Sequence, residues 1–309
     1  MIGWIAPTDY DWFRFLASRP PFEEVNFWTP STHFAFRGEP GAPFFFKLKA
    51  PHSAIAGFGY FQQYEPLPEL IAWEAFGEGN GAQTFEVMKA RVDRIRARNQ
   101  MDSATGLQQI GCIVLANPVF FPREHWVPQP ADWPPRNLRP MRYNLEVSEG
   151  KRIWDECLPL SVLLAPQLPA VAAGENRWGD PVLIRPRLGQ GGFRVALTAA
   201  YGRACAMTEE HSLPALEAAH IKPFALDGPH KVSNGILLRS DIHRLFDAGY
   251  ITVTPDYRVL VSGGLKEHFS NGKSYYPFTN QPLAVLPSRS EDRPDRELLR
   301  WHNEVRFRR

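Results

Sequence analysis

Short apolar runs dominate the first part of this chain, and each run is bounded by glycine or proline. The runs at 44–50, 54–61 and 110–121 have the length and the flanking residues of β-strands. Apolar residues at helical spacing predict a helix over 83–97, and residues 9–17 predict a shorter one. Strands interrupted by helices predict a small β-barrel decorated with helices.

A proline-dense stretch follows this β-rich part. Residues 122–150 predict little regular structure, and a helix is expected over 151–165. We therefore expect three parts: a β-rich domain over 1–125, a proline-rich linker with a connecting helix over 126–175, and a second domain over 176–309.

The second domain mixes helix-like and strand-like patterns. Residues 190–201 fit a helix entered through a glycine turn, residues 216–221 alternate like a strand, and residues 240–249 repeat like a helix. Residues 250–263 predict a β-hairpin, and the chain ends in a predicted short helix packed through Leu298, Leu299 and Trp301. The predicted fold class is therefore α+β.

Composition excludes several classes of protein. A chain of 309 residues with 44% hydrophobic and 22% charged residues is typical of a soluble globular protein with two domains. No apolar run reaches the roughly 18 residues of a membrane span, and the first residues lack the pattern of a signal peptide. Cys112, Cys157 and Cys205 are widely spaced, which argues against a zinc ribbon or a disulfide framework and predicts a cytoplasmic setting.

Charge is divided unevenly between the two parts of the chain. Residues 1–175 carry 16 Lys and Arg against 19 Asp and Glu, a balance of −3, whereas residues 176–309 carry 19 against 14, a balance of +5. The basic excess is mild, but it lies in the part that holds the chemical motif described next. A positive balance there is expected if this part contacts phosphates.

Three residues between 216 and 251 suit the hydrolysis of a phosphodiester bond. Such a reaction needs a base for the attacking water and a cation to neutralise the charge that develops on oxygen. His220 ends the strand-like segment and can act as the base, because imidazole titrates near neutral pH. Asn234, in a turn dipeptide with Gly235, can fix the loop by side-chain hydrogen bonds.

His243 is the candidate cation ligand, in the first turn of the predicted helix over 240–249. Ser240 or Asp241 is the expected N-cap of this helix, and Gly249 is its expected stop. Asp247 follows His243 by four residues, so both side chains lie on one helix face, and Asp247 is a candidate second ligand.

This arrangement resembles the catalytic module of HNH nucleases, the ββα-metal class. The resemblance implies a general base at His220, a loop-orienting residue at Asn234 and a ligand for one divalent metal ion, Mg²⁺ or Mn²⁺, at His243. Many HNH nucleases place an acidic ligand just before the base, but this chain has Ala219 there. Asp247, Asp241 or Glu217 could be the second ligand, or water and phosphate could complete the sphere. Glu217 is the weakest of these, because a straight strand would point it away from His220.

Basic and polar residues around this motif are candidate DNA contacts. Arg can grip phosphate in a fork, and the glycine turn before residue 190 exposes backbone N–H groups. A solvated basic face is the alternative interpretation for all of them. The candidates are Arg185, Arg187, Gln190, Arg194, Lys222, Lys231, Arg239 and Arg244.

The N-terminal part resembles PUA-like barrels, including those that read modified bases. The resemblance is carried by the segments at 44–51 and 55–61 and by the sequence WEAFGEGNG. It implies an aromatic-lined pocket for a flipped base. The candidate wall residues are Phe27, Trp28, Trp73 and Phe76, and the candidate partners of the base edge are Asn26, Ser53 or Asn80. Aromatic residues of a small barrel can equally be core residues.

Together these features predict a DNA endonuclease that acts as a modification-dependent restriction enzyme. The expected partner is double-stranded DNA, possibly carrying a modified base, with no membrane association. A homodimer is one arrangement that would cut both strands. Ala219 leaves open a nucleic-acid-binding protein with a degenerate, inactive HNH fold, and PUA-like domains leave open an RNA substrate.

Overall fold

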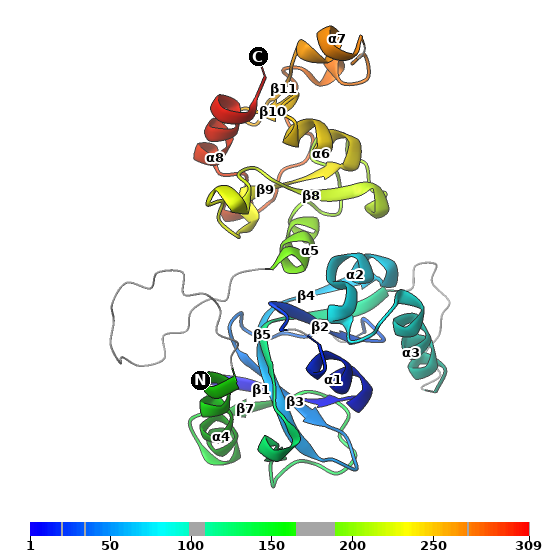
Figure 1. Ribbon diagram of the computed structural model, residues 1–309, viewed down its shortest axis with the longest axis vertical. Helices are drawn as coiled ribbons and strands as arrows, with labels where there is room; N and C mark the ends of the chain where they lie inside the picture. The colour runs from blue at the N-terminus through cyan, green and yellow to red at the C-terminus, as the bar shows by residue number, and fades with distance from the viewer. Residues whose placement is uncertain (20, 34, 99–108, 165–188, 271, 309) are drawn as a thin grey trace. The chain divides into compact units, whose positions relative to one another are not determined.

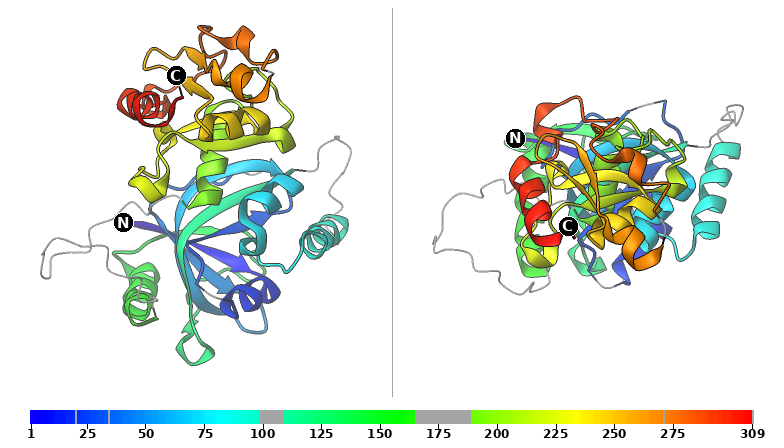
Figure 2. Two further views of the ribbon diagram at one scale, coloured as in Figure 1. Left: turned by 45° about the horizontal axis from the view of Figure 1, so that its top comes forward. Right: turned by 90° about the horizontal axis from the view of Figure 1, so that it is seen from above.

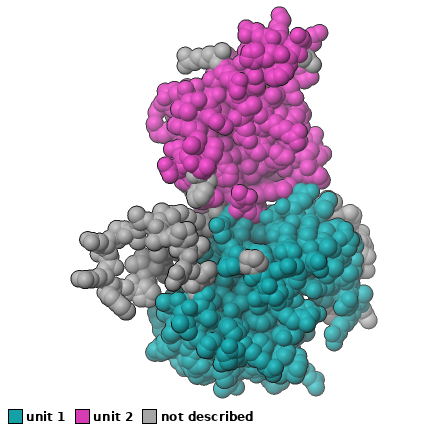
Figure 3. Space-filling model, viewed as in Figure 1, with its two compact units in different colours: residues 1–189 teal, residues 190–309 magenta. Residues whose placement is uncertain are grey.

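The computed structural model describes residues 1–19, 21–33, 35–98, 109–164, 189–270 and 272–308. The chain forms two compact units, Met1–Gly189 and Gln190–Arg309, which have different colours in Figure 3. Both units mix helices with sheet, so the predicted α+β class is confirmed.

The first unit is built on a seven-stranded mixed sheet. Its elements in chain order are β1 (Ile2–Thr8), α1 (Tyr10–Ala17), β2 (Glu24–Thr29), β3 (Pro43–Leu48), β4 (Ala54–Pro68), α2 (Glu69–Phe76), η1 (Gly77–Asn80), α3 (Phe85–Arg98), β5 (Gln109–Phe120), η2 (Arg123–His125), β6 (Val127–Pro128), β7 (Met141–Asn144) and α4 (Ser148–Leu164).

The sheet runs in the order β2-β5-β4-β3-β1-β7, with β6 paired to β4. Strands β1 and β3 are parallel, and the other pairs are antiparallel. The 15-residue strand β4 shifts register against β5 after Phe58 and again after Phe61, and such bulges bend a strand. The sheet is therefore curved, but within the described residues its edge strands β2 and β7 do not pair to close a barrel.

Both faces of this sheet are covered. Phe44 and Phe46 of β3 lie in one core with Trp12 of α1, whereas Phe45 lies in a second core with Ile153 of α4. Helices α1 and α4 accordingly cover opposite faces of the sheet (Figures 1 and 2). All six residues of β3 are buried. This explains why the run at 44–50 is continuously apolar instead of alternating.

The proline-dense stretch 122–150 contains more regular structure than its composition predicts. Strand β7 pairs with β1 from Ile2↔Asn144 to Ile5↔Met141, and Tyr143 and Trp133 are buried in the second core. Strand β7 itself contains no proline: it begins directly after Pro140, so the prolines of this stretch leave its hydrogen-bond donors intact. The expectation of an irregular segment was wrong for this part.

The second unit holds the elements of the predicted motif. They are α5 (Gln190–Ala200), η3 (Leu213–Ala215), β8 (Leu216–His220), η4 (Phe224–Leu226), η5 (Val232–Asn234), β9 (Gly235–Arg239), α6 (Ser240–Asp247), β10 (Ile251–Val253), β11 (Val259–Val261), α7 (Gly264–Phe269), η6 (Tyr276–Phe278), η7 (Ser290–Asp292), α8 (Arg296–Trp301) and η8 (His302–Arg306). The predicted hairpin over 250–263 is present as β10 and β11.

Strands β8 and β9 form an antiparallel pair, from Leu216↔Arg239 to His220↔Gly235, and α6 follows β9 directly (Figure 1). Helix α6 buries Ile242 and Phe246, and Gly249 ends its turn with a left-handed φ of 78°. The result is a ββα arrangement.

The predicted N-cap of α6 was wrong. Arg239 holds that position, Ser240 is the first helical residue, and no side chain caps the first turn. Neither predicted residue can serve: Ser240 is already helical, and the Asp241 carboxylate is bonded to Arg239 and Tyr275.

In the parts of the chain that the structure describes, we find no helix with the length and apolar character needed to cross a membrane.

Candidate active site

His220 lies at the end of β8, opposite Gly235 of β9. Its imidazole stacks on the ring of Phe193 from α5, with centroids 4.0 Å apart and planes at 11°. Its Nε2 atom is buried and has no hydrogen-bond partner in the described structure. Burial lowers the pKa of His220, and His230 and His243 lower it further. The imidazole is therefore neutral near pH 7 and can accept a proton.

Gly235 makes room for the Phe193 ring. Its backbone is extended, with φ at −141°, so no left-handed conformation requires glycine here. A Cβ at this position would lie 2.5 Å from Cζ of Phe193 and 2.9 Å from Cδ1 of Leu197. The glycine of the Asn-Gly dipeptide is thus required by packing against α5, not by a turn.

Asn234 closes the loop that runs on from His220. Its Oδ1 accepts from the backbone N–H of Lys222 at 2.9 Å, and its Nδ2 donates to the carbonyls of Lys222 and Pro229, each at 2.9 Å. The Asn234 side chain is fully buried. Because Ile221 N–H also donates to the Asn234 carbonyl, the residues after His220 are held at both backbone and side chain.

His243 lies on α6 between two carboxylates. Its Nδ1 is 2.6 Å from Oε2 of Glu217, and its Nε2 is 3.3 Å from Oδ2 of Asp247. Burial acts to lower the pKa of His243, but hydrogen bonds to Asp247 and Glu217 outweigh it and raise the pKa. His243 and Asp247 both act electrostatically on His220, so the two imidazoles share one region.

The structure separates the alternatives for a second cation ligand. Asp247 lies beside His243, as the helical spacing predicts. Asp241 is bonded to Arg239 and Tyr275, and these partners hold its pKa at about 2 against the effect of burial. Ala219 is fully buried and has no donor group, so the position before the base supplies no ligand.

Glu217 is the residue that sequence reasoning undervalued. Strand alternation predicts that Glu217 points away from His220, but this expectation says nothing about which element packs over its side chain. Helix α6 brings His243 to the Glu217 carboxylate. No local pattern in the sequence gives this contact, because the two residues are 26 positions apart.

The donors suit a divalent cation with few protein ligands. Oxygen and nitrogen ligands lie about 2.0–2.2 Å from such a metal, so neighbouring donors on one ion are about 3 Å apart. The 3.3 Å between His243 Nε2 and Asp247 Oδ2 fits this spacing. Among the described residues no group of three or more His, Cys, Asp or Glu forms a metal site. Two protein donors leave most of the coordination sphere to water and phosphate, and Mg²⁺ bound to proteins usually keeps several waters.

The predicted DNA contacts have different surroundings. Gln190 and Arg244 are exposed, whereas the ammonium of Lys231 is 3.4 Å from Asp295 and that of Lys222 lies over the Trp301 ring. Arg194 Nη2 donates to the Leu216 carbonyl, and Arg239 is paired with Asp241. Arg185 and Arg187 lie outside the described residues.

In the candidate pocket for a flipped base, in the first unit, the aromatic side chains are partly accessible, but the side-chain amide of Asn80 is not. Trp28 of β2 and Trp73 and Phe76 of α2 are half-buried. Asn80 is fully buried: its Oδ1 accepts from Asn26, and its Nδ2 donates to the carbonyls of Ala72 and Gly77. Asn80 therefore ties β2 to α2, and reading a base edge would break these bonds.

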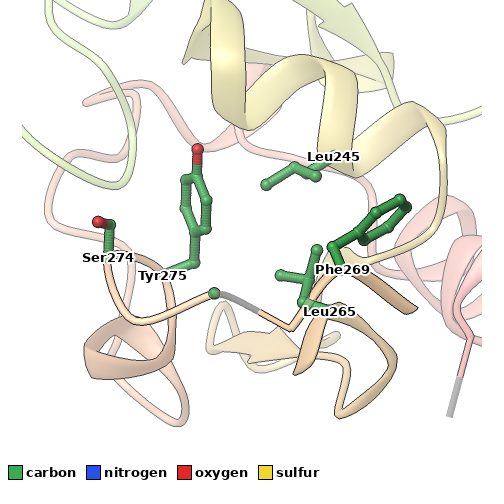
Figure 4. Close-up of a pocket in the computed structure, with 6 residues that line it drawn as sticks. Leu245, Leu265, Phe269, Ser274 and Tyr275 are labelled. Atoms are coloured by element: carbon green, nitrogen blue, oxygen red, sulfur yellow. The ribbon is translucent and has the colours of Figure 1, made fainter. Parts of the chain in front are cut away.

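A hollow of about 410 Å³ lies beside α6. Its lining is mostly apolar and consists of Leu245, Leu265, Phe269, Gly272, Ser274 and Tyr275 (Figure 4). The residues assigned to base and cation are absent from this lining, so the hollow is a separate feature.

A family of known proteins matches the segment of the second unit that forms the ββα arrangement. Residues 205–254 match the HNH endonuclease family. This segment contains β8, β9 and α6 with His220, Asn234 and His243, so the resemblance seen in the sequence is confirmed for this segment.

Two solved structures resemble half of the chain. The ASCH protein from Zymomonas mobilis is 11% identical with a TM-score of 0.34, over 50% of this chain and 94% of that one. A single-substitution variant of it is 10% identical with a TM-score of 0.34, over 50% of this chain and 96% of that one. No curated protein sequence matches this chain.

Proposed function

We propose that this protein is a metal-dependent endonuclease that hydrolyses phosphodiester bonds in double-stranded DNA. The observation that carries the proposal is the buried, unpartnered Nε2 of His220 in the same region as the His243–Asp247 pair. Both lie in the segment that matches HNH endonucleases. A neutral imidazole with a free acceptor suits a base, and an imidazole beside a carboxylate suits a cation ligand.

His220 would act on the attacking water. Its Nε2 takes one proton as the water oxygen bonds to phosphorus, and the bond from phosphorus to the leaving oxygen breaks. The stack on Phe193 fixes the plane of the base, and the bonds of Asn234 fix the loop beside it. His243 and Asp247 would hold Mg²⁺ or Mn²⁺, which neutralises the charge on the leaving oxygen.

For the first unit we propose recognition of a DNA feature, with a modified base as the target. Its resemblance to PUA-like readers and the partly accessible rings of Trp28, Trp73 and Phe76 support this role. The nuclease would then be a modification-dependent restriction enzyme in the cytoplasm. A homodimer would supply two nuclease modules for a double-strand cut.

The test is cleavage of matched DNAs that are plain, methylated, hydroxymethylated or glucosylated, with Mg²⁺, Mn²⁺ or a chelator. We expect cleavage of one or more modified DNAs, its loss with chelator, and its loss in His220→Ala with DNA binding retained. Removing a general base lowers rates by about 10²- to 10⁴-fold. His220→Ala cutting at the parent rate would refute the base assignment, and an RNA competitor that is cut faster would move the substrate to RNA.

The buried Ala219 favours a second candidate, a nucleic-acid-binding protein with an inactive HNH fold. Tight binding without nicking of any DNA in the panel, at every cation concentration, would establish it in place of the nuclease.

A further inference from the structure

We infer that Glu217 is a positioning residue, which holds the His243 ring so that Nε2 is turned to the cation; the inference rests on the proposed nuclease function. Among the described residues, the one hydrogen-bond contact of the Glu217 carboxylate is with His243 Nδ1, at 2.6 Å. This distance is typical of a strong, charge-assisted bond between an N–H and a carboxylate.

When the ring is neutral, the shorter of its two carboxylate contacts favours the proton on Nδ1, which is 2.6 Å from Glu217, over Nε2, which is 3.3 Å from Asp247. A neutral imidazole has one N–H and one acceptor, and a carboxylate can only accept. With Nδ1–H donating to Glu217, the lone pair lies on Nε2, the atom 3.3 Å from Asp247 Oδ2. Metal-binding imidazoles commonly have such an outer partner, and losing it lowers metal affinity about 10- to 100-fold.

The position of Glu217 is set by rigid elements. It pairs with Leu238 inside the β8–β9 ladder, and His243 is held by α6, whose Ile242 and Phe246 are fully buried. The carboxylate is partly exposed, with 41% of its side-chain surface accessible. It could therefore turn to solvent, so its contact with Nδ1 is a specific interaction and not a consequence of confinement.

A direct role as ligand is the competing interpretation, and the state of the His243 ring separates the two. The measurement is nuclear magnetic resonance of full-length protein that carries ¹⁵N-labelled histidine, at pH 8.5. The parent is compared with Glu217→Gln and Glu217→Ala, and His243→Ala assigns the His243 signals. We expect the Nδ1–H form in the parent, a weakened Nδ1–H bond in Glu217→Gln, and a shift towards the Nε2–H form in Glu217→Ala. The exposed Glu267→Gln is the matched control and leaves the ring unchanged.

Binding of Mn²⁺, followed by electron paramagnetic resonance, gives the second measurement. The Kd rises about 10- to 100-fold in Glu217→Ala and less in Glu217→Gln, and saturating Mn²⁺ restores most of the cleavage rate. If Glu217→Ala does not fold, the Nδ1–H proton resonance of Glu217→Gln decides, and an unmoved resonance overturns the inference.

The two proposals can fail separately. A parent protein that cuts no nucleic acid removes the proposed function, but the tautomer of His243 still reports what Glu217 does. A ring that keeps its tautomer in folded Glu217→Ala, with normal cleavage by the parent, overturns the positioning role alone.

Discussion

The ring of Phe193 lies flat against the imidazole of His220, 4.0 Å away and inclined by 11°. The two residues come from α5 and β8, and Gly235 of β9 leaves the space in which the phenyl ring fits. The orientation of the candidate base therefore depends on a residue without a side chain, and this dependence can be tested.

Gly235→Ala should destabilise the second unit and slow cleavage together. The added Cβ meets Phe193 at 2.5 Å, and overpacking of this kind costs about 1–3 kcal/mol in the free energy of unfolding. Gly263→Ala is the matched control, because a Cβ there meets no atom within 4 Å. Thermal unfolding and cleavage rates of both variants check this; equal effects of the two substitutions would contradict the packing role.

Asn234→Asp should loosen the loop after His220. An ionised carboxylate cannot donate to the carbonyls of Lys222 and Pro229, so two hydrogen bonds are lost at a cost of about 1–3 kcal/mol. Hydrogen exchange measured by mass spectrometry should become faster over residues 221–234 and stay unchanged in β10 and β11. Unchanged protection of the loop would show that the side chain does not hold it.

The pH dependence of cleavage should report His220. Burial lowers its pKa, so at saturating Mn²⁺ the rate should hold down to pH 6.5, the ordinary value for imidazole, and fall only below it. At low Mn²⁺ the acidic limb should begin at higher pH, since protonated His243, whose pKa is raised despite burial, competes with the metal. An acidic limb above pH 6.5 that does not respond to Mn²⁺ would exclude His220 as the base.

Acid should destabilise the second unit through His302. Its ring stacks on Phe246 of α6 and bonds to Thr252 Oγ1, and burial lowers its pKa to about 4. Because the unfolded chain binds the proton at pH 6.5 and the folded chain only near pH 4, stability falls as pH drops through this window. The loss approaches about 3 kcal/mol.

Hydrogen exchange of α6 at pH 7, 6, 5 and 4 measures this loss in the second unit alone. His302→Asn, which does not titrate here, should show a weaker pH dependence. Parallel pH profiles for the variant and the parent would assign the acid sensitivity to other groups.

Periodicity along the chain was sufficient to predict the strand and the helix that carry the motif. The alternation before His220 and the helical spacing of His243 and Asp247 are local properties, and the structure forms β8 and α6 there with Asp247 beside His243. The long strands β4 and β5 were equally visible as apolar runs, but β7 was not, because its four residues contain no continuous apolar run and follow a proline-dense stretch.

The amino-acid sequence by itself determined where the strand, loop and helix of the motif lie and which residue types they present. Only the tertiary structure decided three contacts. Glu217 lies within hydrogen-bond distance of His243, Gly235 leaves the space for the Phe193 ring, and the Asn80 side chain is hydrogen-bonded within the first unit. The reason is physical: backbone periodicity sets the face on which a side chain emerges, whereas its partner depends on which distant element packs over that face.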